Sequence, residues 1–303
     1  MTDAIRGAVS MLTALGILLT LAGYFGHAHP AFDSLAALRI QFAVGFAGVL
    51  LFSVAFAALT ARLLAVTGLL IAGAGIAPAA FPGDPVPQPQ LSVYSHNLRF
   101  DNGAPDEVLA QISAAGPDVV VLQEIGAPNE DIVERLARRY RNQVLCPFAS
   151  VGGVAILTNA RLLDKPGCLK GQGAAWVRLG TDVGPLTVVG LHLHWPWPYG
   201  QPEQISSIAR ELSALDEPVL IAGDFNAPSW SHAVDRIAAA TGTRPSPGLR
   251  LTFRRPGVWP GLPLDHMLLS EDLSGEVAIL PAAGSDHMAL LGRITFRTRA
   301  VAN

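Results

Sequence analysis

Charged side chains are scarce in this sequence. Asp, Glu, Lys and Arg make up 15% of its 303 residues, whereas an ordinary soluble domain has about 25%. With only two cysteines and 50% apolar residues, the chain is neither a disulfide-dense mini-protein nor disordered, and its composition also excludes a coiled coil. The net charge of −3 gives no indication of a polyanionic partner.

The few charges are distributed unevenly along the chain. Residues 1–90 contain only Asp3, Arg6, Asp33, Arg39, Arg62 and Asp84. All other charged residues lie in the remaining 213 positions, a length sufficient to bury one substantial core. The sequence therefore predicts two unlike regions that meet near residue 90.

The first region contains three long apolar stretches, at about 8–26, 40–59 and 63–80. Each is close to the roughly 20 residues with which a helix crosses a bilayer, so we predict about three transmembrane helices. A secretory signal would account for only the first stretch, and buried helices of a soluble domain are the alternative. Arg6 and Arg62 would share one side of the membrane. The positive-inside tendency then predicts an integral protein of the cell (inner) membrane with an extracytoplasmic C-terminal region.

Residues 81–90 (FPGDPVPQPQ) contain four prolines, a composition typical of a semi-rigid spacer. Both cysteines, Cys146 and Cys168, follow this segment and flank an apolar run at 154–157. They form either a disulfide, as in an oxidising compartment, or two buried free thiols. A disulfide would agree with an external location.

The second region alternates short apolar runs with helical patterns. Strands are predicted at 91–95, 119–122, 154–157, 175–179, 186–191, 219–222, 264–269 and 288–294, and helices at 105–115, 130–139, 201–215 and 231–240. Ser231 is predicted to be the N-cap of the last helix. Helices between buried strands predict an α/β layered fold.

Polar side chains lie at the ends of several of these predicted strands. The clusters are Ser95-His96-Asn97, Gln123-Glu124, His192, Asp224-Phe225-Asn226 and Asp265-His266, and Ser285-Asp286-His287 precedes the last strand. Polar groups at strand ends converge on one edge of a sheet sandwich, where they form a site.

Carboxylate, amide and imidazole groups suit hydrolysis of a phosphoester, which needs a hard divalent cation, a positioned water and donors for transition-state charge. Glu124 follows the run VVVL, where a carboxylate requires a partner such as a cation. Asp224 and Asn226 share one side of an extended segment and could align a water and hold a phosphate; a simple Asx turn is the alternative. Asp265 could orient His287 and stabilise its protonated form.

The ordered series Asn97, Gln123-Glu124, His192-Leu193, Gly223-Asp224-Phe225-Asn226, Asp265-His266 and Ser285-Asp286-His287 resembles the endonuclease/exonuclease/phosphatase superfamily. The resemblance covers about residues 91–296. It implies a four-layer α/β sandwich and cleavage of phosphoester bonds that depends on Mg²⁺, with Mn²⁺ as the alternative. We therefore expect a transmembrane region at 1–80, a spacer at 81–90 and a catalytic domain at 91–303.

The resemblance also implies roles for individual residues. The metal would be bound by Asn97, Glu124 and Asp286. Asp224 would position or deprotonate the attacking water, and Asn226 would hold the scissile phosphate. His192 would stabilise or protonate the leaving group. Asp265 and His287 would act at the phosphate, with His287 either as general base or as an electrostatic stabiliser.

Two residues depart from the family pattern. Arg99 stands where some DNA-cleaving members carry an acidic metal contact; it either faces the phosphate or forms a salt bridge. His194 duplicates His192 two positions later, and only His192 fits the family spacing.

The substrate is indicated by what surrounds the motifs. Only two lysines are present, which disfavours duplex DNA because gripping a duplex requires a basic face; the arginines at 135–141 are typical of a solvated helix face. The loop aromatics are Trp195, Trp197, Tyr199, Trp230 and Trp259. They favour a bilayer interface or an apolar substrate tail, with ordinary loop packing as the alternative.

These observations predict a membrane-anchored phosphodiesterase or phosphatase that acts on a lipid-linked or small phosphoester. A membrane-anchored nuclease with the same residues is one alternative. The other is a non-catalytic membrane protein that binds a partner through a retired site. The sequence does not indicate an oligomeric state.

Overall fold

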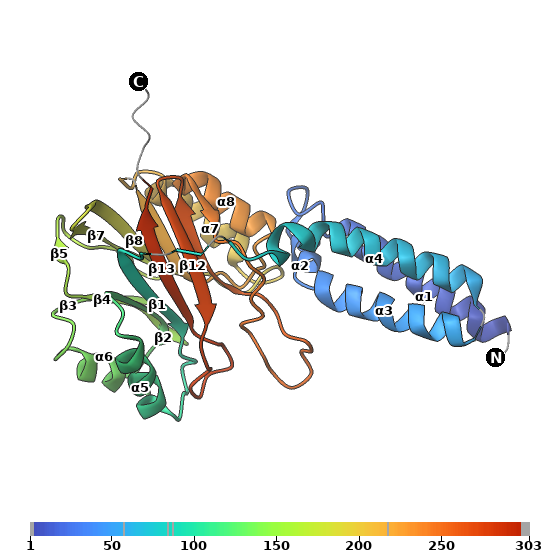
Figure 1. Ribbon diagram of the computed structural model, residues 1–303, viewed down its shortest axis with the longest axis horizontal. Helices are drawn as coiled ribbons and strands as arrows, with labels where there is room; N and C mark the ends of the chain where they lie inside the picture. The colour runs from blue at the N-terminus through green and yellow to red at the C-terminus, as the bar shows by residue number, and fades with distance from the viewer. Residues whose placement is uncertain (1–2, 57, 84, 87, 217, 298–303) are drawn as a thin grey trace, which may run out of the picture.

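Long apolar helices form the first part of the chain. The structure, a computed structural model, describes residues 3–297 apart from positions 57, 84, 87 and 217. Helices α1 (Asp3–Ala22), α3 (Arg39–Ala55) and α4 (Leu59–Ala80) run side by side, and α2 (Pro30–Ala36) joins the first two next to an α/β domain (Figure 1). α1 and α4 are long and apolar enough to cross a membrane, and α2 and α3 qualify together as a pair bent by 55°. The predicted count of about three spans depends on this bent pair.

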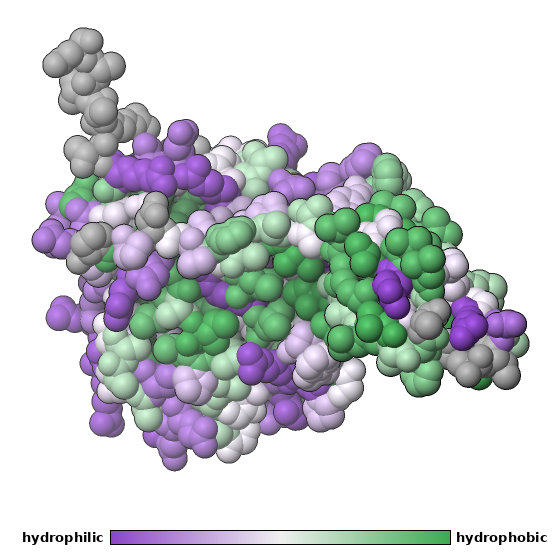
Figure 2. Space-filling model, turned by 45° about the vertical axis from the view of Figure 1, so that its right-hand side comes forward, coloured by the Kyte–Doolittle hydropathy of each residue, from purple (hydrophilic) through white to green (hydrophobic). Residues whose placement is uncertain are grey.

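The helical bundle packs through small side chains and exposes large apolar ones. On α4 the buried residues are Ala61, Ala65, Gly68 and Ala72, and a Cβ added at Gly68 would lie 2.7 Å from the ring of Phe46. More than half exposed are Leu12, Leu15, Leu18, Leu51, Leu59, Leu63 and Leu70. Figure 2 shows an apolar surface on this part of the molecule. Close packing through small residues is typical of helices surrounded by hydrocarbon.

Two mixed sheets form the centre of the α/β domain. The first sheet has the order β12 (Leu273–Ile279), β13 (Leu290–Phe296), β1 (Leu91–Asn97), β2 (Val119–Ile125), β4 (Gly152–Thr158) and β3 (Asn142–Ala149). The second has the order β10 (Thr243–Pro245), β11 (Asp265–Ser270), β9 (Val219–Asp224), β8 (Gly184–His192), β7 (Ala174–Thr181) and β5 (Arg161–Leu162), with β6 (Gly167–Leu169) also paired to β7. The pairs β1–β2 and β8–β9 are parallel, and the other pairs are antiparallel.

Helices cover the outer faces of both sheets. They are α5 (Pro105–Ala115) and α6 (Glu130–Leu136) on the first sheet and α7 (Gln201–Leu212) and α8 (His232–Thr241) on the second (Figure 1). One apolar cluster, including Val121 and Val188, lies between the sheets. Two further clusters lie under the helices, around Ile112 on one side and Ile237 on the other. The predicted α/β sandwich is therefore present.

The predicted strands correspond to β1, β2, β4, β7, β8, β9, β11 and β13. Strands β3, β5, β6, β10 and β12 were not predicted, because they are very short or half-exposed and lack a continuous apolar run. Helices α6 and α7 end earlier than predicted, since backbone bonds shift to the three-residue spacing, as from Leu215 to Leu212. Ser231 is the predicted N-cap of α8; its hydroxyl accepts a 3.2 Å hydrogen bond from the Val234 amide.

The described residues of the predicted spacer, 81–90, form neither helix nor strand; positions 84 and 87 lie outside the described part. At its end, Gln90 continues the sheet, because its amide donates to the Ile294 carbonyl and its side-chain oxygen accepts from the Phe296 amide. The proline-rich segment is thus joined directly to β13.

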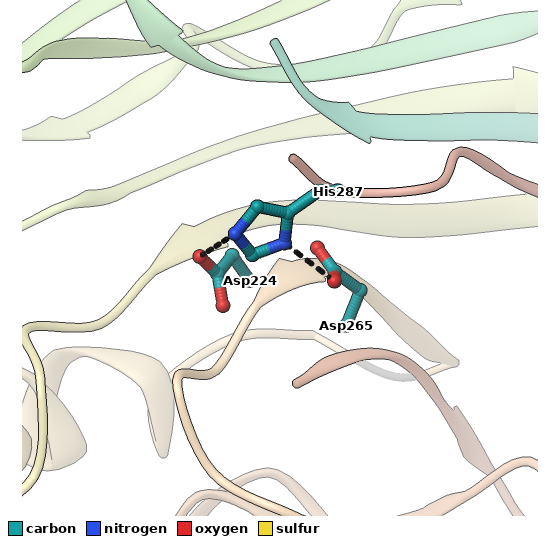
Figure 3. A group of neighbouring side chains, drawn as sticks. All are labelled: Asp224, Asp265 and His287. Atoms are coloured by element: carbon teal, nitrogen blue, oxygen red, sulfur yellow. Dashed lines mark hydrogen bonds and ion pairs between the residues drawn. The ribbon is translucent and has the colours of Figure 1, made fainter. Parts of the chain in front are cut away.

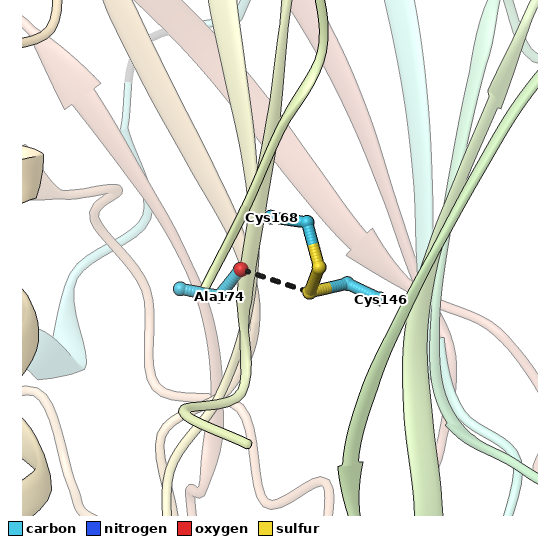
Figure 4. The surroundings of a disulfide bond; sticks show 3 residues. All are labelled: Cys146, Cys168 and Ala174. Carbon is cyan, nitrogen blue, oxygen red and sulfur yellow. Dashed lines mark hydrogen bonds between the residues drawn. A yellow bond between two sulfur atoms is a disulfide. The ribbon is translucent and has the colours of Figure 1, made fainter. Parts of the chain in front are cut away.

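The two cysteines form a disulfide between the sheets (Figure 4). Cys146 lies on β3 in the first sheet and Cys168 on β6 beside the second, with Cα atoms 5.4 Å apart. Of the two alternatives left by the sequence, the structure contains the disulfide. It ties together two outlying strands that backbone pairing leaves in different sheets.

Replacing both cysteines by alanine is expected to lower the free energy of unfolding by about 3 kcal/mol, because the unfolded chain then loses a cross-link that closes a loop of this size. Thermal denaturation followed by circular dichroism measures the change. Dithiothreitol should lower the Tm of the parent protein but not that of the C146A/C168A variant. Equal melting temperatures of parent and variant under oxidising conditions would contradict the disulfide.

Candidate active site

Parallel strand pairs place the predicted site residues at one edge of the sandwich. Asn97 at the end of β1 lies opposite Gln123, and His192 at the end of β8 lies opposite Asp224. Asp265 at the start of β11 is also paired with Asp224. A cleft of about 280 Å³ opens at this edge. The predicted site residues that line it are Glu124, Asp224, Asn226, Asp286 and His287.

The side chain of Asn97 connects the two sheets beside the cleft, because it bonds one residue of each sheet. Its side-chain amide donates to Glu124 Oε1 at 3.0 Å and to Asp224 Oδ2 at 2.9 Å. Glu124 Oε2 accepts from the Phe100 amide at 2.8 Å. Burial raises the pKa of Glu124, against the lowering effect of these hydrogen bonds. Two carboxylates thus share one amide group in a site with little solvent.

The backbone at Glu124 directs its side chain into the cleft. The residue has φ of 60°, and the register between β2 and β4 shifts between Gln123 and Ile125. A bulge of this kind re-aims one side chain relative to its strand. A left-handed conformation is costly for a residue with a Cβ and is concentrated at functional sites.

The turn after β9 orients Asp224 and Asn226. A Cβ at Gly223 would lie 1.9 Å from the Leu191 carbonyl oxygen, and φ there is +152°, so only glycine fits. The Asn226 amide donates to Asp224 Oδ1 at 2.8 Å, and its side-chain nitrogen donates to the Leu193 carbonyl at 2.8 Å. Asn226 Oδ1 is buried without a hydrogen-bond partner among the described residues, so this oxygen can accept a hydrogen bond from a bound water.

His287 lies between two carboxylates (Figure 3). Its Nδ1 is 2.8 Å from Asp265 Oδ2, and its Nε2 is 3.7 Å from Asp224 Oδ2. Burial alone would lower the pKa of His287, but the two carboxylates outweigh it and raise the pKa to about 10. Burial likewise raises the pKa of Asp265, but His287 more than compensates and lowers it overall. The ring is therefore a buried imidazolium.

The pKa of His192 is shifted in the opposite direction from that of His287. The Nε2 of His192 lies 3.7 Å from Asp224 Oδ2 and 3.9 Å from Glu124 Oε1, yet burial lowers its pKa to about 3. The ring packs against Phe148, with centroids 5.1 Å apart, so water has little access. A neutral histidine and a protonated histidine thus face the same carboxylate, Asp224.

Comparison with known proteins shows the family of the chain. Residues 94–287 match the Endonuclease/Exonuclease/phosphatase family. The chain belongs to this family. Members of the family are hydrolases that act on phosphoesters, and they are commonly metal-dependent.

Individual relatives are more distant. A UPF0294 protein of Vibrio cholerae is 34% identical over 167 residues, which are 48% of this chain and 56% of that protein. The chain thus spans little more than half the length of this curated relative.

Solved structures of the same fold include a family protein from Bacteroides vulgatus, with 17% identity and a TM-score of 0.56, covering 68% of this chain and 99% of that one. The beta toxin of Staphylococcus aureus with bound magnesium ions has 14% identity and a TM-score of 0.51, with 69% and 100% covered. The human Nocturnin catalytic domain with bound sulfate has 17% identity and a TM-score of 0.52, with 68% and 94% covered. At these identities the likeness is one of fold.

The family's metal dependence can be compared with the donors present in this chain. Asp224, Asp265 and His287 are close enough to hold an ion together, but both nitrogens of a protonated His287 carry hydrogens and therefore offer no lone pair to a metal. Glu124 offers a better place, because its carboxylate lines the cleft with 16% of its side chain exposed, and Asp286 lines the same cleft. Carboxylate and amide oxygens are the ligands that Mg²⁺ prefers, so this donor set fits a hard divalent cation.

The two departures from the family pattern differ in position. Arg99 forms an ion pair with Asp101, with 2.6 Å between Nε and Oδ1, and both residues line the rim of the cleft. Of the two readings of Arg99, the structure contains the salt bridge. His194 packs on Phe148 with ring centroids 4.6 Å apart.

Several residues that complete the site were not predicted from the sequence. Phe253 packs on His287 with ring centroids 5.0 Å apart, and the Thr252 hydroxyl accepts from the Asp265 amide at 3.2 Å. Arg255 lies on the rim, 3.6 Å from Asp286. These residues belong to an irregular loop with no strand or helix pattern. The adjacent pair Arg254-Arg255 is the only signal that could have drawn attention to it.

Proposed function

We propose that this chain is a membrane-anchored, Mg²⁺-dependent phosphoesterase that hydrolyses a phosphodiester or phosphomonoester, with a lipid-linked or small-molecule substrate favoured over duplex nucleic acid. The observation that carries the proposal is the buried arrangement of Asp224, Asp265 and His287 beside the Glu124–Asn97 pair in one cleft. Membership of a family of phosphoester hydrolases supplies the reaction class. The two rim arginines and the two lysines of the whole chain are too few to grip a duplex.

The metal would be held by Glu124 and Asp286. Asn97, expected from the sequence as a further ligand, turns its side-chain nitrogen toward Glu124 and Asp224, and its side-chain oxygen accepts from the Arg99 amide at 2.9 Å. When bound, Mg²⁺ supplies Lewis-acid stabilisation of negative charge on the phosphoryl oxygens. Both acidic ligands line the cleft, and the amide of Asn97 orients Glu124.

Asp224 accepts the proton of the attacking water. Desolvation raises its pKa to about 7, close to the value that suits a general base at neutral pH. Asn97 and the Asn226 amide each donate to one of its oxygens and orient the carboxylate. The water oxygen bonds to phosphorus, its proton passes to Asp224, and the bond from phosphorus to the leaving oxygen breaks.

The two histidines take different roles. His287 is protonated and donates from Nε2 toward a phosphoryl oxygen, so it stabilises the charge of the transition state; Asp265 orients it through Nδ1. His192 is neutral because burial lowers its pKa to about 3. A neutral imidazole donates a hydrogen bond but does not readily give up a proton. His192 therefore donates a hydrogen bond on the leaving-group side, and the leaving oxygen takes its proton from solvent. Asn226 holds the scissile phosphate with its remaining side-chain hydrogen.

We assign residues 1–80 to the membrane, 81–90 to a spacer and 91–303 to the catalytic domain. The 20 residues of α1 and the 22 of α4 span about 30 Å or slightly more at 1.5 Å per residue, the thickness of the hydrocarbon layer. The outward-facing leucines of the bundle support the same assignment. The disulfide is typical of an oxidising compartment and supports an extracytoplasmic catalytic domain.

Substitutions in the site are expected to reduce kcat of the folded protein. Because removing one member of a buried charged set also lowers the Tm, turnover is measured well below the Tm of each variant. D224N and H287A should each lower turnover of bis(p-nitrophenyl) phosphate by at least about 100-fold, because each removes a group that acts only in the transition state. H194A is the matched control, since His194 packs on Phe148 beside the site, and it should stay within about threefold. A loss of less than tenfold in both site variants, measured on folded protein, would contradict the assignment.

Chelation is expected to abolish activity. Full-length protein in detergent should hydrolyse at least one member of a panel of phospholipids, inositol phosphates, single-stranded DNA and duplex DNA with Mg²⁺, but none in EDTA. E124Q should require at least tenfold more Mg²⁺ for half-maximal rate. Activity in EDTA would remove the metal from the proposal, and preferential cleavage of DNA would make the chain a nuclease.

The bundle is expected to hold the protein in the membrane. Alkaline carbonate should leave the full chain in the membrane pellet, because apolar contacts with lipid do not depend on salt or pH. A C-terminal alkaline phosphatase fusion should be active, since that reporter requires the extracytoplasmic side. Release by carbonate would contradict anchoring, and an active cytoplasmic reporter at the same position would contradict the topology.

A further inference from the structure

The helical bundle and the catalytic domain are linked by the spacer and also meet at a junction of hydrogen-bonded residues. The Asp33 carboxylate in α2 accepts from the His232 and Ala233 amides at 2.7 and 2.9 Å, so it caps the first turn of α8. Trp230 Nε1 donates to the Ala36 carbonyl at 2.9 Å. Two separate segments of the bundle, α2 and the end of α4, therefore attach to the domain and restrict its orientation.

The loops that contact this junction also form the cleft. The Ser34 hydroxyl donates to the Trp197 carbonyl at 2.9 Å, in the loop after β8, which also carries the cleft-lining Trp195. The Gln41 side chain, in the first turn of α3, donates to the Gly261 carbonyl at 2.9 Å. The loop that contains Gly261 lies beside the start of α3 (Figure 1).

A short chain of contacts links that loop to the catalytic residues. Leu262 pairs with Phe253 through a β-bridge, and Phe253 forms a second bridge with His287. The ring of Trp195 packs edge-on against Phe253, with centroids 5.6 Å apart. The mouth of the cleft is therefore close to the end of α3 that would enter the membrane.

Large aromatic side chains are exposed on these two loops. Trp195 is 42% exposed, Trp197 49%, Tyr199 64% and Trp259 72%. Figure 2 shows the apolar surface of the bundle continuing onto the neighbouring part of the α/β domain. Trp and Tyr are enriched where a protein meets the headgroup region of a bilayer.

We propose that an aromatic rim, defined as Trp195, Trp197, Tyr199 and Trp259, seats the mouth of the cleft on the surface of the bilayer that the helices cross. The substrate is then a phosphoester lipid of the leaflet on which the rim is seated. The inference rests on the proposed function and deepens it. A lipid headgroup reaches the cleft by lateral diffusion, and Arg255, whose side chain is 61% exposed on the rim, offers positive charge to its phosphate. Confinement to one surface raises the effective substrate concentration without any new contact.

Tryptophan quenching tests the surface without depending on activity. Full-length protein is reconstituted in phosphatidylcholine/phosphatidylglycerol vesicles with or without lipid brominated near the headgroup end of its acyl chains. Bromolipid should quench part of the fluorescence, and W197F/W259F should lose at least half of that quenching. W176F is the matched control, because Trp176 lies on β7 in the sheet, against Gly167, and it should keep the quenching of the parent. Equal quenching in W197F/W259F and the parent would overturn the seating.

Turnover tests the substrate class. Protein and lipid are placed either in the same vesicles or in separate ones, and release of phosphorylated headgroup or phosphate is measured, with soluble bis(p-nitrophenyl) phosphate as reference. Hydrolysis should be at least tenfold faster in the same vesicles, and W197A/W259A should lower the ratio of lipid to soluble turnover at least tenfold. Equal rates in both arrangements, or no lipid hydrolysis beside intact soluble hydrolysis, would overturn the inference and leave the proposed function standing. Failure of all phosphoester hydrolysis would instead overturn the proposed function.

Discussion

The active-site edge of the sandwich depends on the pairing of buried charges. Asp224, Asp265 and His287 are each no more than 3% exposed, and an isolated charge at such a depth is strongly disfavoured. The three groups stabilise one another, because the imidazolium is attracted to the carboxylate on each side of it. The set in turn requires β9 and β11 to be neighbours in register and requires the loop that carries Phe253 to cover the ring. Much of the fold around the cleft can be understood as support for this arrangement.

Backbone strain is concentrated at the same place. Glu124 and Asn226 both have positive φ, and Gly223 has a conformation and a close contact that exclude any side chain. Strained residues persist where the surrounding structure over-determines them. Here that structure is the packed interior between the two sheets, with the disulfide from β3 to β6 as an additional link. The scaffold and the site are therefore coupled, because the core stabilises side-chain positions that the local backbone disfavours.

The junction makes the N-terminal region more than a flexible tether, because it restricts the orientation of the catalytic domain. A flexible tether would increase local concentration in any orientation, whereas Asp33, Trp230 and Gln41 connect the bundle to particular loops of the domain. Those loops end at the cleft. The geometry thus relates the direction of the helices to the direction in which the site opens, which is a property of the assembled chain and not of either part alone.

The sequence by itself determined the α/β class, the central strands and the identity of the polar residues at their ends, because a buried strand needs a continuous apolar run and chemistry needs particular side chains. It did not determine the edge strands β3 and β12, whose half-exposed residues follow no strong pattern. It left the disulfide and the role of Arg99 open, since both depend on distances between segments far apart in the chain. Thr252, Phe253 and Asp33 carry no local motif at all. Only the tertiary structure decided their roles, because hydrogen bonding, ring packing and charge burial act through space and are set by which strands and loops become neighbours.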